Sequence, residues 1–101
     1  MLGLFVKDER LGISIPNLDR DWKSYTLKEQ SMILSSWEKE RAKIPDKIKE
    51  LEKIVTYKTK ELLVENNGDK MEQLNNEIMT FASMINDLNI LFRIEPTLTV
   101  D

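Results

Sequence analysis

The sequence predicts an all-α protein built on an antiparallel helical hairpin, in which a long kinked helix packs against a shorter one. The shorter helix carries apolar residues at alternating intervals of three and four: Met71, Leu74, Ile78, Phe81, Ile85, Leu88 and Phe92. These are the a and d positions of a heptad repeat, so one stripe of this helix must be buried against another helix. A second seam precedes it, and the Asn66–Asn67–Gly68 turn between them is too short for anything but antiparallel helices.

The long helix is expected to begin at Thr26, where Thr26 and Glu29 have the spacing of a capping box. Its a and d positions are Leu27, Gln30, Leu34, Trp37, Arg41, Ile44, Ile48, Leu51, Val55, Lys58 and Leu62. The register passes through Pro45 without slipping, although proline disrupts a helix interior. We therefore expect one long helix with a kink near residues 41–45. A restart with Pro45 at the first helical position is the alternative.

Three segments follow from this pattern. Residues 1–25 contain two short β-like runs, around Phe5 and Ile13, with Gly12 ending the charged stretch between them, so they predict an extended or hairpin-like segment. Residues 26–93 form the helical hairpin, in which Asp69 is expected to cap the shorter helix. Residues 94–101 form a short tail of alternating apolar residues, which either adds a strand or stays mobile.

The two helices differ in length, and this difference predicts how the chain assembles. At about 1.5 Å per residue, the shorter helix spans roughly 35 Å and the longer one roughly 58 Å. The seam before about Ala42 is then left without a partner. A sharp bend at Pro45, coverage by the terminal segments, or a second copy of the chain would each bury it. The unbroken register favours the second copy, that is, a dimeric helical bundle and a homo-oligomer.

The candidate interface follows from the same mismatch. Its residues are the overhanging seam, the charged seam position next to the kink and two apolar residues beside the seam: Leu27, Leu34, Trp37, Arg41, Met84 and Leu91. Tryptophan is enriched at the centre of interfaces, so Trp37 is the expected anchor. Its burial in the core of its own chain is an equal alternative. Met79 and Ile90 lie further round the shorter helix and widen its apolar side.

The residue types argue against catalysis and against cofactor or metal binding. The chain has no cysteine and no histidine, which removes thiolate ligands, disulfides and the commonest general base. Its carboxylates fall off the seam, where they are expected to pair with neighbouring lysines. The formal net charge is −3, with acidic and basic residues interleaved, so nucleic acid is an unexpected partner. We therefore predict no catalytic, cofactor-binding or metal residues.

Location is predicted from what the sequence lacks. The first residues have no basic region and too short an apolar run for a signal peptide. No stretch approaches the roughly 20 apolar residues of a membrane span. A cytoplasmic location without membrane contact is the expectation.

Residues 37–46 (WEKERAKIPD), 74–78 (LNNEI) and 85–88 (INDL) resemble small uncharacterised helical proteins of Gram-positive bacteria. This resemblance covers residues 37–93 and implies a bacterial helical protein, with no particular activity or site. The sequence as a whole therefore predicts a non-enzymatic helical protein that binds other proteins, or regulates them as an adaptor, through a coiled-coil surface. A nucleic-acid-associated regulator is the alternative.

Overall fold

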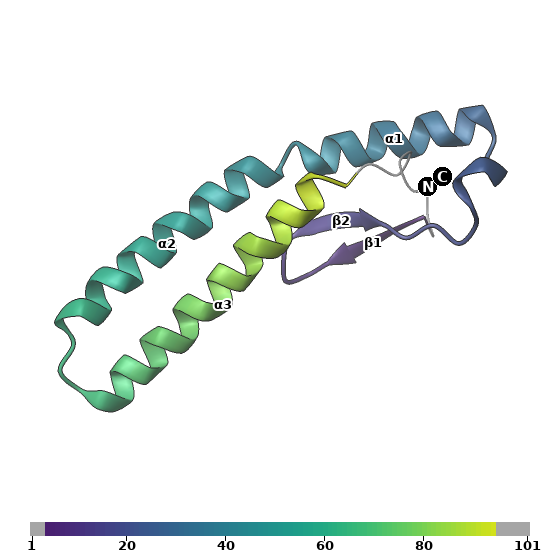
Figure 1. The fold of residues 1–101 in the computed structure, drawn as a ribbon. Coiled ribbons are helices and arrows are strands. Elements are labelled where there is room, and N and C mark those ends of the chain that lie inside the picture. Colours follow the sequence, from purple (N-terminus) through teal and green to yellow (C-terminus); the bar gives the residue numbers. More distant parts are fainter. Residues whose placement is uncertain (1–3, 95–101) are drawn as a thin grey trace. The chain divides into compact units, whose positions relative to one another are not determined.

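The computed structural model describes residues 4–94 and divides them into two compact units (Figure 1). The N-terminal unit contains residues 4–44 together with residues 91–94, and the hairpin unit is Pro45–Ile90. The elements are β1 (Phe5–Asp8), β2 (Ile13–Pro16), a short 3₁₀ helix η1 (Trp22–Ser24), α1 (Leu27–Arg41), α2 (Ile44–Val64) and α3 (Gly68–Phe92). The described part of the chain is thus mostly helical, as predicted. The tail predicted to follow Ile94 lies outside the described residues.

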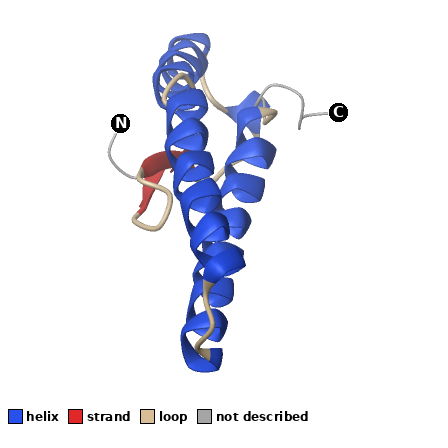
Figure 2. Ribbon diagram, turned by 90° about the vertical axis from the view of Figure 1, so that its left-hand side faces the viewer, coloured by secondary structure: helices blue, strands red, loops and turns tan. Residues whose placement is uncertain are grey.

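The predicted β-like segment is a two-stranded antiparallel sheet, drawn in red in Figure 2. β1 pairs with β2 so that Val6 lies opposite Ile15. Asp8 stabilises the turn, because its carboxylate accepts the N–H of Leu11 at 2.9 Å and its carbonyl accepts the N–H of Gly12 at 2.7 Å. Gly12 has a φ of 72°, a conformation that side chains other than glycine rarely adopt.

This hairpin is stabilised by packing on α1, since two strands alone are marginal in water. β2 lies against α1, and Ile13 is 1% exposed. The backbone N–H of Ser14 donates to Oε1 of Glu40 on α1 at 2.7 Å. One strand is therefore joined to the helix by both apolar contact and a charge-assisted hydrogen bond.

A second cluster fills the N-terminal unit at the start of α1. Trp22, Tyr25 and Ile33 form its buried centre, and Leu4, Phe5, Leu18 and Leu34 pack around them. The Tyr25 hydroxyl donates to Oδ1 of Asp19 at 2.8 Å, and the amide of Gln30 donates to the carbonyl of Trp22 at 2.9 Å. The Tyr25 hydroxyl and the Gln30 amide are therefore hydrogen-bonded within this apolar cluster.

Helix α1 begins as predicted and is interrupted at the expected place. Thr26 and Glu29 form the complete capping box, with hydrogen bonds of 2.8 and 3.1 Å. α1 ends at Arg41, two turn residues follow, and α2 begins at Ile44. Pro45 has no N–H for the carbonyl of Arg41, and its ring crowds that carbonyl, which explains the interruption.

The hairpin unit consists of α2 and α3, which run antiparallel side by side (Figures 1 and 2). Leu74 on the α3 seam is 5% exposed, and the α2 seam residues of this unit, such as Ile48 and Val55, are half-buried. The cap of α3 differs from the prediction. Asn67, not Asp69, caps the helix: its side-chain oxygen accepts the N–H of Lys70 at 3.1 Å, and α3 begins at the next residue, Gly68.

Candidate protein-interaction surface

Two of the predicted interface residues pack in the apolar interior of the N-terminal unit. Trp37 is 1% exposed, and its indole N–H donates to the carbonyl of Ile94 at 2.9 Å. Leu34 is half-buried against the cluster around Ile33. Residues of the N-terminal segment pack on this part of α1. This arrangement agrees with the alternative in which Trp37 belongs to the core of its own chain.

The other predicted residues occupy varied positions. Leu27 is 84% exposed, because as the first residue of α1 it points away from the cluster that buries Ile33. Arg41 is half-buried: its guanidinium lies 2.6 Å from Oε1 of Glu38 and 5.7 Å from the centre of the Phe92 ring. Leu91 and Met84 are half-buried, Leu91 in the N-terminal unit and Met84 in the hairpin unit.

A different surface stands out on α3. We call it the outer α3 face, and its residues are Asn75, Met79, Ala82, Ser83, Asn86 and Ile90. Their spacing places them on one side of the helix, and all six are exposed, with Met79 at 62% and Ile90 at 52%. Asp87 is the one charged residue between Ile78 and Phe92, in a chain that is 33% charged. The core of a protein interface is depleted of charge in the same way.

Part of this face was visible in the sequence. The sequence marks Met79 and Ile90 as apolar residues outside the seam, whereas the heptad pattern does not single out the asparagines around them. The stronger signal is that Asp87 is the one charged residue in the last four turns of α3. A hydrophobic pattern does not register it, because an amide and a carboxylate both count as polar.

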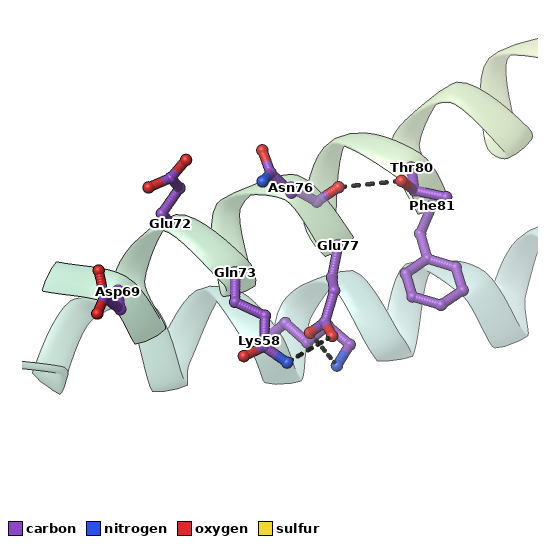
Figure 3. A pocket seen from close by; sticks show the side chains of 8 residues that line it. All are labelled: Lys58, Asp69, Glu72, Gln73, Asn76, Glu77, Thr80 and Phe81. Carbon is purple, nitrogen blue, oxygen red and sulfur yellow. Dashed lines mark hydrogen bonds and ion pairs between the residues drawn. The ribbon is translucent and has the colours of Figure 1, made fainter. Parts of the chain in front are cut away.

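One flank of the hairpin unit is acidic. A shallow groove there is lined by Lys58, Asp69, Glu72, Gln73, Asn76, Glu77, Thr80 and Phe81 (Figure 3). Lys58 lies at a seam position of α2, and its ammonium group lies 2.9 Å from Oε1 of Glu77 on α3. This ion pair joins the two helices, so Lys58 helps to fix their register, as a polar residue on a seam can do.

The same contacts keep Glu77 ionised. The hydrogen bond from Lys58, and then the one from Gln73, lower the pKa of the Glu77 carboxyl below its ordinary value. A general acid or base that works near neutral pH requires a carboxyl pKa raised toward 7. The groove therefore holds a fixed, paired carboxylate, which suits a structural role better than proton transfer.

The outward side of α2 is basic. Three lysines, Lys49, Lys53 and Lys60, surround the exposed Tyr57, and Glu52 lies among them. We call this surface the α2 lysine strip. The hairpin unit thus presents three chemically different surfaces: an acidic groove, a basic strip and an uncharged face.

Neither a metal site nor a membrane-spanning helix is present among the described residues. Within residues 4–94, no three or more acidic side chains are grouped so that they could hold a metal ion. Across the same residues, none of the helices combines the length and the apolar character that crossing a membrane requires. Comparison with protein-family models, curated proteins and solved structures gave no match to this chain.

Proposed function

We propose that this chain is a non-enzymatic, cytoplasmic protein-interaction module that binds other proteins through its helical hairpin. The observation that carries the proposal is the outer α3 face, where apolar and amide side chains are exposed over four helical turns without a charge. Lone exposed apolar residues are normal on a protein surface, but a continuous uncharged face on an otherwise highly charged chain is typical of binding surfaces.

The arrangement of the N-terminal unit supports the same proposal. Its largest side chains, Trp22, Tyr25 and Trp37, are all buried within the unit. They contribute to folding and are not available to a partner. We therefore assign binding to the hairpin unit and a structural role to α1 and the β-hairpin.

Met79→Glu tests the proposal, because it places a charge in the centre of the outer α3 face without disturbing a buried residue. Tagged wild-type and variant chains are used to capture partners from a lysate of the source cells. We expect Met79→Glu to lose partners that the wild type retains. Met32→Glu is the matched control, since Met32 is 44% exposed on α1. If all three chains captured the same proteins, the outer α3 face would not be the binding surface.

Nucleic acid is the alternative partner, and the α2 lysine strip is the observation in its favour. Three lysines beside an aromatic ring can contact phosphates and a base. However, Glu52 lies in the strip and the net charge of the chain is −3, so few phosphates would be neutralised. Fluorescence anisotropy with single- and double-stranded oligonucleotides at low salt distinguishes the two functions. Binding that Lys53→Glu abolishes would favour the nucleic-acid function.

A further inference from the structure

We infer that the occupant of the outer α3 face is a second copy of this chain, packed with its α3 antiparallel to the first. This inference rests on the proposed function, because it names the partner of the same face. Two features of the face point to a copy of itself, namely its lack of charge and the spacing of its residues. Its area sets how strongly two copies would associate.

The charge of each surface decides whether the surface can meet its own copy. Two α2 lysine strips would bring Lys49, Lys53 and Lys60 against the same lysines, and two acidic grooves would bring carboxylates together, so both pairings are repulsive. The outer α3 face carries no charge that could repel. Asparagine amides are uncharged, so Asn75 and Asn86 can meet a copy of the chain without like-charge repulsion.

The positions of the face, though not its residue types, are spaced symmetrically about its middle. Ala82 and Ser83 form the midpoint, Met79 and Asn86 lie equally far from it, and Asn75 and Ile90 form the next pair outward. In an antiparallel pairing about a two-fold axis, Met79 therefore lies opposite Asn86, and Asn75 lies opposite Ile90. The small residues meet at the axis, where helix backbones approach most closely. The opposed dipoles of the two helices favour the same orientation.

The area of the face predicts a weak dimer. Residues 75–90 span about 24 Å of helix, and half the surface of a cylinder of that length and about 12 Å across is about 450 Å². Two copies then bury about 900 Å², slightly below the roughly 1,000 Å² that marks a stable interface. We therefore expect association that depends on concentration and is detectable at submillimolar protein.

Single cysteines test the geometry directly, because the chain contains none of its own. Ala82→Cys lies next to the two-fold axis and should oxidise to a covalent dimer. Met79→Cys should not cross-link to itself, because its two copies would lie about 10 Å apart along the axis. Mixed with Asn86→Cys, it should give the mixed dimer. Thr56→Cys, exposed on the α2 lysine strip, is the matched control.

Sedimentation equilibrium provides the second measurement. Wild-type chain should associate, and Ala82→Glu should weaken the association at least about tenfold, because two carboxylates would meet at the axis. Thr56→Glu should leave it unchanged. The association should persist in high salt, whereas a pairing of the lysine strip with the acidic groove would be lost there.

Other outcomes would overturn the inference. Equal self-cross-linking at positions 79, 82 and 86 would indicate parallel helices. A strict monomer at submillimolar concentration would show that the outer α3 face does not bind a second copy of the chain. Cross-linking of Ala82→Cys that is no faster than that of Thr56→Cys would show the same. If Met79→Glu still lost its captured partners in that case, the proposed function would stand with a different protein as the occupant.

Discussion

At the scale of single residues, Glu40 connects three segments of the N-terminal unit. Its Oε1 accepts the N–H of Ser14 on β2, and its Oε2 lies 2.8 Å from the ammonium group of Lys43 in the turn after α1. Burial of the side chain raises the pKa of Glu40, but the Lys43 and Ser14 hydrogen bonds outweigh it, and the pKa is lowered overall. The folded state therefore favours the ionised carboxylate.

This shift makes stability depend on pH in a defined direction. A carboxyl whose pKa is lower in the folded chain contributes stability above the unfolded value of about 4.3 and loses it as the pH falls through the folded value. Glu40→Gln should reduce the free energy of unfolding by about 1 kcal/mol at pH 7. The difference from wild type should shrink below about pH 4. Urea unfolding at several pH values measures it, with the exposed Glu50→Gln as control. A deficit that is the same at pH 7 and pH 3 would show that the charge of Glu40 is not its source.

At the scale of elements, the β-hairpin and α1 depend on one another. Neither strand exceeds four residues, and β2 is held by the contact of its apolar side with α1. Ile13 is the most deeply buried strand residue, whereas Val6 on β1 is 52% exposed. Substitutions at these two positions therefore distinguish the stability gained by packing the sheet on α1 from the stability due to β-strand propensity.

Ile13→Ala should destabilise the chain by about 2–5 kcal/mol, since it removes a buried side chain and leaves a cavity. Val6→Ala should cost less than about 1 kcal/mol, as expected for an exposed strand position. Thermal unfolding followed by circular dichroism gives both values. Similar losses for the two variants would mean that the sheet is not packed on α1 as described.

The sequence was informative for the elements that repeat and less so for those that do not. The apolar stripe of α3, the capping box at Thr26 and the kink near Pro45 each depend on local spacing. In the structure the stripe is buried or half-buried from Leu74 to Leu88, the capping box is complete, and the long helix is bent where the kink was expected. In α1 the buried stripe includes Ile33, which lies beside the predicted seam position Leu34. The reason is tertiary packing. Trp22 and Tyr25 pack against α1 and bury Ile33, and this contact cannot be predicted from the spacing of apolar residues along the helix.

At the scale of the whole molecule, the boundary between the two units falls inside helices. α2 begins with Ile44 in the N-terminal unit and continues in the hairpin unit, and α3 ends with residues 91–92 back in the N-terminal unit. Helical backbone therefore crosses each boundary in the sequence. Helix formation is cooperative along the chain, so the loss of one part of a helix weakens the remainder.

We therefore expect the two units to unfold together. Both tryptophans of the chain, Trp22 and Trp37, are buried in the N-terminal unit, so their fluorescence reports on that unit alone. Ile85 is a half-buried seam residue of the hairpin unit. Ile85→Asp places a charge on the seam and should cost several kcal/mol, a large part of the total stability of a small domain.

The fluorescence transition of Ile85→Asp should then move to lower urea together with the circular dichroism transition, although neither tryptophan lies in the altered unit. Thr56→Asp, on the exposed side of α2, should shift both only slightly. Coincident transitions are the mark of two-state unfolding. If helicity fell while the tryptophan transition stayed at its wild-type position, the N-terminal unit would be stable by itself. Unfolding of the hairpin unit would then not be coupled to unfolding of the N-terminal unit through the helices that they share.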